Sequence, residues 1–223
     1  MRTSLVMGLL TIVTIFTVLA TINANAYAEV GTPGDDDIDT GAGNDQNIGL
    51  GGDDNIESNG GEDTNIGDNP EGDDDGGDDT IDSGDGDDVN IGDNDQGNGD
   101  GGDDTIKSGD GDDENVGDFS TGDGDGGNDK IKSGDGDDTN FGDNEEAGSG
   151  AGGNDKIKRG DGDDTNTGST GADKFNCGKG TDTVTDFEES QGDKVKKTVK
   201  PSSNLSSFFY NVNSFLQLSL FDL

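Results

Sequence analysis

The 223-residue chain has 52 acidic and 13 basic residues, no histidine and a formal net charge of −39 at pH 7, and only 24% of it is hydrophobic. Composition alone is typical of a disordered polyanion, and the repulsion among the carboxylates opposes any compact state that binds no cations. Nucleic acid is excluded as a partner because its phosphates would be repelled, and histidine-based triads and histidine-containing zinc sites are excluded as well.

The first segment, residues 1–28, is predicted to be a secretory signal peptide. A positive charge at Arg2 precedes an apolar run over residues 5–22, and small residues provide two cleavage sites, after Ala26 and after Ala28. This order of charge, apolar run and small residues is typical of export signals. The alternative is an uncleaved N-terminal anchor, because the apolar run is nearly long enough to span a bilayer.

Residues 29–187 are organised around an Asp that recurs in a nine-residue frame, each time with Gly two residues before it. Nine of the thirteen steps between successive members are nine residues long, three are sixteen and one is seventeen. A disordered chain needs no such register, so the periodicity predicts a folded array of repeats. The fourteen members are Asp36, Asp45, Asp54, Asp63, Asp79, Asp88, Asp104, Asp113, Asp129, Asp138, Asp155, Asp164, Asp173 and Asp182.

Each of these Asp residues is followed by three residues that are predicted to form a short strand whose middle residue faces inward. Two turns and two strands would make one coil of an all-β solenoid, a parallel β-roll or β-helix. The middle residue alternates between two columns. One column is Ile38, Ile56, Ile81, Ile106, Ile131 and Ile157, and the other is Asn47, Asn65, Asn90, Asn115, Asn140 and Asn166.

The Asn column leaves two arrangements open. An apolar residue follows most of these Asn residues, at Ile48, Ile66, Ile91, Val116 and Phe141. Neighbouring strand residues point to opposite faces, so only one of the two columns faces inward. Either the Asn side chains form an internal hydrogen-bonded ladder, or this face is shifted by one residue and the apolar column faces inward.

Four central coils are predicted to carry inserted loops at one edge of the roll. The insertions are rich in Gly and Asp and lengthen the coil from 18 residues to 25 or 26. They cover residues 67–76, 92–101, 117–126 and 142–152. In the first repeat, Thr32 and Pro33 replace the usual turn residues, which predicts a weak site there.

Residues 188–223 are predicted to form a C-terminal cap or a poorly ordered apolar tail. A stacked roll leaves its last face open, so it needs a cap. A membrane span is disfavoured because Asn211, Asn213 and Gln217 interrupt the apolar residues, although membrane contact of another kind stays open. Cys177 is the only cysteine, so no internal disulfide can form, and it is expected to be a small buried residue.

Segments 102–107 and 108–116 show the repeat most clearly, as parts of the pattern G-G-x-G-x-D-x-U-x, where U is a large apolar residue. Asp104 and Asp113 take its sixth position. The pattern resembles the RTX (repeats-in-toxin, haemolysin-type) calcium-binding nonapeptide, which forms parallel β-rolls. The resemblance covers residues 31–186, and the Asn column departs from it. It implies that the fourteen sixth-position Asp residues bind Ca²⁺ together with main-chain carbonyl oxygens of the Gly-rich turns.

The predicted function is that of a secreted calcium-binding repeat protein that folds when it binds Ca²⁺. Ca²⁺ takes six to eight oxygen ligands, more than one turn supplies, so each ion would bridge neighbouring coils. Seven Asp residues on each side leave six gaps per side, which allows about twelve ions at most. Calcium ions are the predicted ligand, and cell-surface or matrix components are the predicted partners of a structural, adhesive or cell-surface role.

Two other functions remain as alternatives. The first is a disordered acidic polyanion that buffers cations or binds mineral. The second is an accessory fragment of a secreted enzyme or toxin. Nothing outside the predicted roll is large enough to hold a catalytic domain, so the chain is predicted not to be an enzyme.

Overall fold

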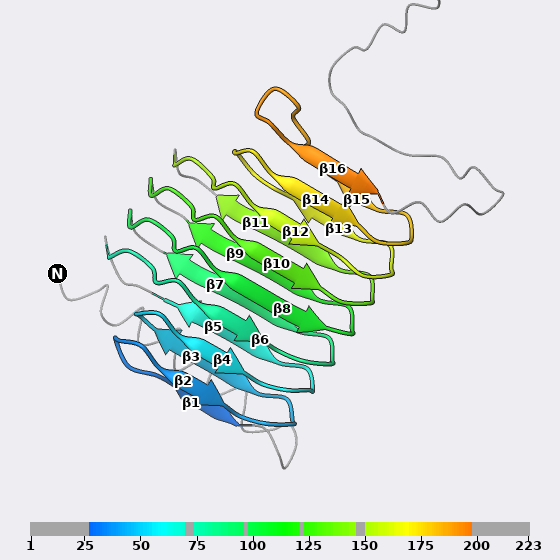
Figure 1. Cartoon of the computed structure of the whole chain (residues 1–223). Coiled ribbons are helices and arrows are strands. Elements are labelled where there is room, and N and C mark those ends of the chain that lie inside the picture. The colour runs from blue at the N-terminus through cyan, green and yellow to red at the C-terminus, as the bar shows by residue number, and fades with distance from the viewer. Residues whose placement is uncertain (1–26, 70–73, 96–97, 121–122, 146–149, 198–223) are drawn as a thin grey trace, which may run out of the picture.

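The fold is described from a computed structural model, over residues 27–69, 74–95, 98–120, 123–145 and 150–197. These residues form sixteen strands and no helix, stacked as a parallel β-roll (Figure 1). The all-β roll predicted from the repeat is therefore confirmed. Most of the predicted signal peptide and all residues after 197 lie outside the described residues. No helix in the described ranges is long and apolar enough to cross a membrane.

The first sheet contains the odd-numbered strands, each paired in parallel with the next. They are β1 (Ala28–Val30), β3 (Gln46–Leu50), β5 (Thr64–Asp68), β7 (Val89–Asp95), β9 (Glu114–Ser120), β11 (Thr139–Glu145), β13 (Thr165–Thr167) and β15 (Thr183–Val184). The second sheet contains the even-numbered strands in the same manner. They are β2 (Asp37–Asp39), β4 (Asn55–Glu57), β6 (Thr80–Asp82), β8 (Thr105–Gly109), β10 (Lys130–Ser133), β12 (Lys156–Lys158), β14 (Lys174–Cys177) and β16 (Lys194–Lys197).

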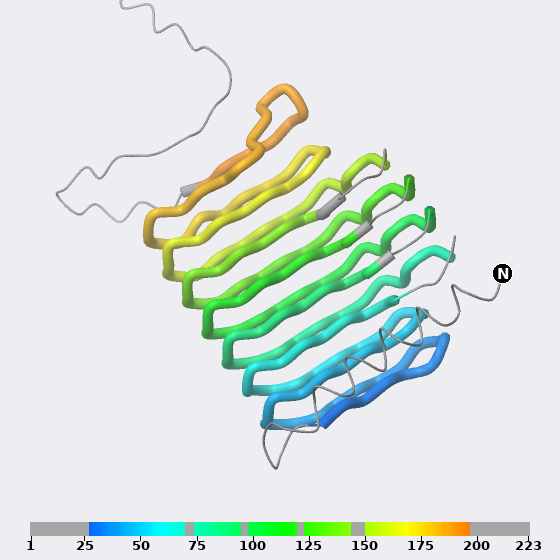
Figure 2. The backbone as a smooth tube through the Cα atoms, turned by 180° about the vertical axis from the view of Figure 1, so that it is seen from behind, coloured from blue at the N-terminus to red at the C-terminus, as the bar shows by residue number. Residues whose placement is uncertain are grey.

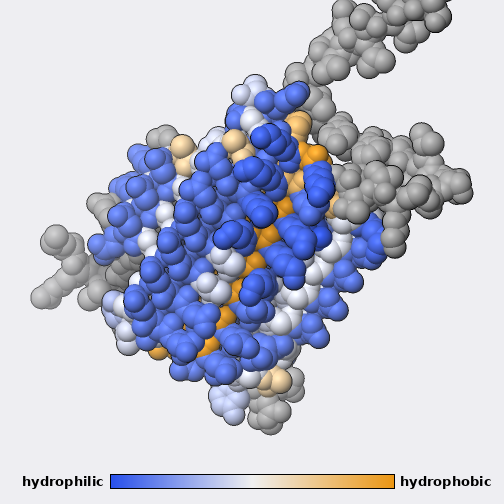
Figure 3. Space-filling view, viewed as in Figure 1, coloured by the Kyte–Doolittle hydropathy of each residue, from blue (hydrophilic) through white to orange (hydrophobic). Residues whose placement is uncertain are grey.

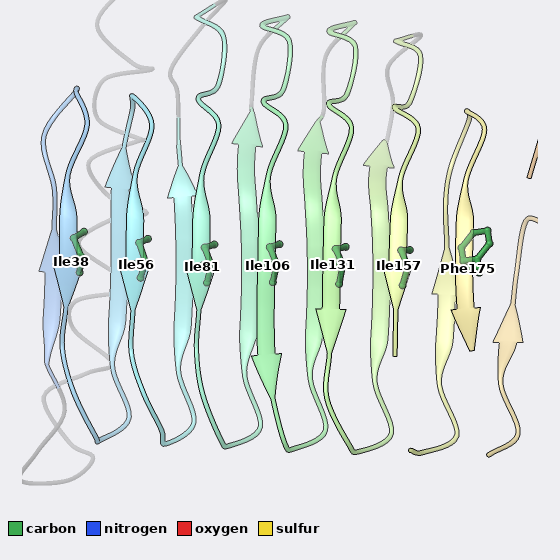
Figure 4. Close-up of a cluster of buried hydrophobic side chains, with 7 residues drawn as sticks. All are labelled: Ile38, Ile56, Ile81, Ile106, Ile131, Ile157 and Phe175. Carbon is green, nitrogen blue, oxygen red and sulfur yellow. The ribbon is translucent and has the colours of Figure 1, made fainter. Parts of the chain in front are cut away.

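The apolar core is one residue wide and runs along the second sheet (Figure 4). Its members are at most 2% exposed, and the register places each directly beside the next, as Ile106, Ile131 and Ile157 show. Burying such a side chain contributes about 1.5–3 kcal/mol. The column is Ile38, Ile56, Ile81, Ile106, Ile131, Ile157 and Phe175.

The inward column of the first sheet is the Asn column, which settles the open alternative. All six Asn side chains are fully buried. From Asn47 to Asn140, each amide nitrogen donates to Oδ1 of the next Asn at 2.8–3.2 Å. The same amide groups also donate, at 3.0–3.3 Å, to side-chain hydroxyls that lie in or directly after the strands of the facing sheet: Thr40, Ser58, Ser83, Ser108 and Ser133. Because both amide hydrogens find acceptors, the interior tolerates these polar groups.

The apolar column of the first sheet consequently faces outward. Ile48, Ile66, Ile91 and Phe141 are half-buried, and Val116 is buried. Apart from this column, the surface seen in the orientation of Figure 1 is hydrophilic, with one narrow apolar stripe along the roll axis (Figure 3).

The insertions begin as extensions of the first sheet. β7, β9 and β11 are seven-residue strands that continue into the inserted segments, and Asp93, Asp118 and Asp143 pair in register. The described parts of the insertions lie at one edge of the roll, as the view from behind also shows (Figure 2). The insertions therefore widen the roll on one side and keep its stacking.

The roll continues past residue 187, its predicted end. β16 (Lys194–Lys197) pairs with β14, and Val195 packs against the apolar core. At the other end β1 begins at Ala28, beside the second predicted cleavage site, and pairs with β3. Cys177 is buried, as expected.

Candidate metal centres

The fourteen predicted Asp residues lie in two straight rows, one at each edge of the roll. The Ile-side row precedes the strands of the second sheet, and the Asn-side row precedes those of the first. The Ile-side row is Asp36, Asp54, Asp79, Asp104, Asp129, Asp155 and Asp173. The Asn-side row is Asp45, Asp63, Asp88, Asp113, Asp138, Asp164 and Asp182.

Each row is held by side-chain to main-chain hydrogen bonds between coils. The main-chain N–H of Asp79, for example, donates to Oδ1 of Asp104 at 2.8 Å. Equivalent bonds of 2.7–3.0 Å join the Ile-side row, and bonds of 2.7–3.1 Å join the Asn-side row from Asp45 to Asp164. One oxygen of most of these carboxylates thus sets the spacing of the coils.

The second oxygen of most of these carboxylates is buried and has no hydrogen-bond partner in the described part of the chain. A buried, unpartnered carboxylate oxygen is costly unless a cation accompanies it. The Oδ2 atoms concerned belong to Asp45, Asp54, Asp63, Asp79, Asp88, Asp104, Asp113, Asp129, Asp138, Asp155, Asp164 and Asp173.

The two rows depart from this pattern at their ends. Oδ2 of Asp36 accepts hydrogen bonds from the main-chain N–H of Thr32 and, at 2.9 Å, from the Thr32 hydroxyl. The carboxylate of the first repeat is therefore occupied by its own turn. At the other end, Asp182 lies beside the guanidinium group of Arg159.

A third row of carboxylates, which the sequence reasoning missed, comes from the start of the insertions. Asp68, Asp93, Asp118 and Asp143 are each at most 3% exposed. Their Oδ2 atoms accept the main-chain N–H of the Gly that directly follows the same insertion, at 2.5–2.8 Å, and their Oδ1 atoms have no hydrogen-bond partner within the described ranges. We call these four residues the loop Asp row.

The loop Asp row meets the Ile-side row in groups of three carboxylates. In each group, one oxygen from every member lies within 4.8 Å of the others. The groups are Asp54, Asp68 and Asp79; Asp93, Asp104 and Asp118; and Asp118, Asp129 and Asp143. Asp118 belongs to two groups, so neighbouring sites share a ligand.

Only four of the fourteen predicted residues therefore enter a group of three in the described ranges: Asp54, Asp79, Asp104 and Asp129. The Asn-side row stacks carboxylates one above another and meets serine hydroxyls instead of a third row. Burial raises the pKa of Asp88 to about 6, while the N–H of Asp63 and the Ser83 hydroxyl oppose the rise. The two edges of the roll thus offer different cation environments.

Glycine is required where the insertions leave the first sheet. A Cβ atom on Gly92 would overlap Oδ2 of Asp104 and approach the carbonyl oxygen of Gly117. Gly67 and Gly117 stand in the same relation to Asp79 and Asp129. The absence of a side chain lets the Ile-side carboxylates reach the loop Asp row.

The carboxylates of these groups are strongly perturbed. Burial, followed by the neighbouring carboxylate of Asp118, raises the pKa of Asp93 to about 9. Burial followed by Asp155 raises the pKa of Asp143 to about 10, and burial holds the pKa of Asp104 well above its usual range. Without a cation these groups favour the protonated form, so a bound cation would displace protons.

The donor set restricts the metal. The groups offer carboxylate oxygens, with no histidine in the chain and no cysteine in the groups. Oxygen-only sites suit the hard cations Ca²⁺, Mg²⁺ and Mn²⁺ and disfavour soft metals. The buried, unpartnered oxygens and the donor chemistry both fit a hard divalent cation.

One sequence signal could have revealed the loop Asp row. A Gly-Asp pair follows the outward apolar residue in each coil that carries an insertion, at residues 67–68, 92–93, 117–118 and 142–143. These pairs repeat at the coil length, as the sixth-position Asp residues do. They fall outside the nine-residue frame, so the frame places them in the inserted loops.

No known protein family, no curated protein and no solved structure matches this chain.

Proposed function

We propose that this chain is a calcium-binding β-roll whose folding depends on the ions it binds. The observation that carries the proposal is the rows of buried carboxylate oxygens that have no hydrogen-bond partner among the residues the structure describes. A net charge of −39 opposes a compact chain, and cations held between the coils would neutralise it. Folding and ion binding would then be one coupled event.

The strongest sites in this proposal are the three-carboxylate groups. Asp54, Asp68 and Asp79 would hold one ion, and the two groups that share Asp118 would hold others. The bound ion would supply the positive charge that lets these carboxylates ionise while buried. The Asn-side row would supply further sites with fewer carboxylates each.

Several observations favour Ca²⁺ over the other hard cations. Ca²⁺ accepts irregular shells of six to eight oxygens, whereas Mg²⁺ requires a near-octahedral shell and retains several waters. Rows of stacked turns provide oxygens at many angles, which suits the more tolerant ion. The resemblance of the nonapeptides to RTX repeats supports the same choice.

The setting that fits this chemistry is outside the cell. The predicted signal peptide would export the chain, and calcium is plentiful there. Extracellular sites can be weak, with dissociation constants of about 10⁻⁴–10⁻³ M, and still be filled. The protein would then serve a structural, adhesive or cell-surface role in which calcium keeps the coils together.

The test is far-UV circular dichroism during a titration with Ca²⁺, with Mg²⁺ titrated in parallel. A cooperative transition from coil to β structure that Ca²⁺ drives and Mg²⁺ does not is the expected result. A coil spectrum that persists to millimolar Ca²⁺ would refute the proposal.

A substitution identifies the sites that drive the transition. Asp118→Asn removes a ligand from two groups, so the calcium midpoint should rise about tenfold, equivalent to ~1.4 kcal/mol. Asp110→Asn is the matched control because Asp110 is exposed and outside every group. Equal midpoints for the two variants would show that the ions that drive the transition do not bind at the loop Asp row.

A further inference from the structure

The basic residues of this acidic chain are concentrated on one face. Of 13 Lys and Arg residues, eight lie at outward positions of the second sheet, whereas the chain has 52 acidic residues. They begin at β8 and continue to β16. The eight, which we call the lysine face, are Lys107, Lys130, Lys132, Lys156, Lys158, Lys174, Lys194 and Lys196.

The lysine face consists of two straight rows. In each strand the two residues that flank the inward residue point outward, so Lys130 and Lys132 stand on either side of Ile131. The register aligns Lys130, Lys156, Lys174 and Lys194 in one row. The other row holds Lys107, Lys132, Lys158 and, after an interruption at Asn176, Lys196. Neighbouring members of a row are about 4.8 Å apart along the roll axis, and the rows are roughly 7 Å apart.

Most of these lysines make no close ion pair within the described ranges. Lys107 pairs with Asp82 at 3.0 Å, but none of the other seven makes an ion pair within the described ranges. Seven of the eight are exposed, and Lys107 is partly so. Like charges directly opposite each other on adjacent strands destabilise a sheet. An anionic partner would turn this repulsion into attraction.

The lysine face is narrow and bordered by acid. On the same face, the strands before β8 carry Asp37, Asp39, Glu57 and Asp82 at the equivalent positions. The turns on either side hold exposed acidic residues, among them Asp103 and Asp135. The positive strip is about 10 Å wide, the length of three strand residues. A broad anionic surface would also contact these carboxylates and be repelled by them, whereas a thin anionic chain would contact only the lysines.

We propose that the lysine face binds a linear anionic polysaccharide, which lies along the roll axis with its carboxylate or sulfate groups on the two lysine rows. A single glycan chain is thin enough for the strip, whereas a nucleic-acid duplex or a membrane would meet the acidic turns. A second copy of the chain that docks with the same face fits less well, because that face offers only the four acidic side chains of the strands before β8 to pair with eight lysines. The proposal rests on the calcium-dependent roll, since only the folded sheet aligns the rows.

The experiment measures binding of the full chain, with saturating Ca²⁺, to immobilised dextran sulfate and polygalacturonate over a range of NaCl concentrations. Lys130→Gln combined with Lys156→Gln should weaken binding about tenfold and lower the slope of log Kd against log[NaCl] by about 1–2. The charge-matched control, Lys179→Gln with Lys200→Gln, should change binding less than twofold. Lys179 lies outside the named strands and pairs with Asp161, and Lys200 is outside the described residues.

Three results would overturn the proposal: equal loss in both double variants, tighter binding to duplex DNA or to phosphatidylserine vesicles than to either glycan, or self-association that disappears in the lysine-face variant. Circular dichroism of each sample distinguishes a failure of the glycan proposal from a failure of the calcium proposal. Loss of glycan binding in the lysine-face variant, with its β spectrum intact, supports the assignment of glycan binding to the lysine face. A β spectrum that needs no Ca²⁺ refutes the calcium proposal and leaves the glycan assay valid.

Discussion

The guanidinium group of Arg159 lies inside the roll, with Nη1 3.7 Å from Oδ1 of Asp182. Arg159 is 4% exposed and donates a hydrogen bond to the Cys177 sulfur at 2.8 Å. It occupies the column position that holds serine in earlier coils, as at Ser133. Burial raises the pKa of Asp164 to about 7, and the charge of Arg159 opposes that rise. A fixed positive charge therefore stands at the end of the Asn-side row.

Replacing Arg159 with serine should make the last coil dependent on an added ion. Removing one member of a buried ion pair leaves carboxylates uncompensated and costs about 3 kcal/mol. We expect Arg159→Ser to raise the calcium midpoint for folding and to increase the ions bound per chain by one. Circular dichroism measures the calcium midpoint and isothermal titration calorimetry measures the number of ions bound. Arg159→Lys is the control that keeps the charge. An unchanged midpoint and ion count would show that Arg159 does not act as a substitute cation.

The Asn ladder should contribute strongly to stability. Asn90→Ala removes the bonds to Asn65, Asn115 and Ser83, all of 2.9–3.0 Å, and leaves buried polar groups unsatisfied. We expect the free energy of unfolding to fall by about 3 kcal/mol, measured by urea titration in saturating Ca²⁺. Asn55→Ala, at an exposed position, should change it by less than about 0.5 kcal/mol. Similar losses in both variants would argue that the ladder is not a structural element.

Without metal ions, the roll should be more stable in mild acid than at alkaline pH. Burial raises the pKa of Asp79 to about 8, with Asp93 at about 9 and Asp143 at about 10, from an ordinary value of 3.8. The folded form therefore binds more protons than the unfolded form. The stabilisation that these bound protons give the folded form is complete below about pH 3.8 and is lost as pH rises through 8–10.

Circular dichroism in EDTA checks this expectation. The β signal should be larger at pH 5 than at pH 8, and Ca²⁺ should restore it at pH 8. Calcium binding near neutral pH should also release protons, which calorimetry in buffers of different ionisation enthalpy detects. A metal-free spectrum that does not change between the two pH values would contradict the buried-carboxylate account.

A methyl group at Gly92 should damage the adjacent metal group. Gly92→Ala places a Cβ atom against Oδ2 of Asp104, so we expect a higher calcium midpoint and a loss of about 2 kcal/mol in the free energy of unfolding. Gly34→Ala is the control, because a Cβ atom there meets open space. Calcium titrations of the two variants give the comparison, and equal midpoints would count against contact between Gly92 and the metal group.

Much of this architecture follows from local periodicity. The fixed frame of Gly and Asp predicted the turns, the strands and both Asp rows, because every coil repeats the same residues at the same offsets. Ile106 and its equivalents could be placed inside for the same reason. The N–H of each Asp bonds the carboxylate of the next coil, so the predicted rows also set the spacing of the stack.

The sequence by itself determined the repeat, the roll and the acidic character of its edges, whereas the tertiary structure alone decided which column faces inward and which carboxylates meet. Asn115 and Val116 are adjacent, and only the serine column across the interior, which accepts the second amide hydrogen, favours the asparagine. Asp118 and Asp129 come together because the insertion returns to the neighbouring turn. Contacts of this kind depend on the path of the chain between coils, which no nine-residue pattern encodes.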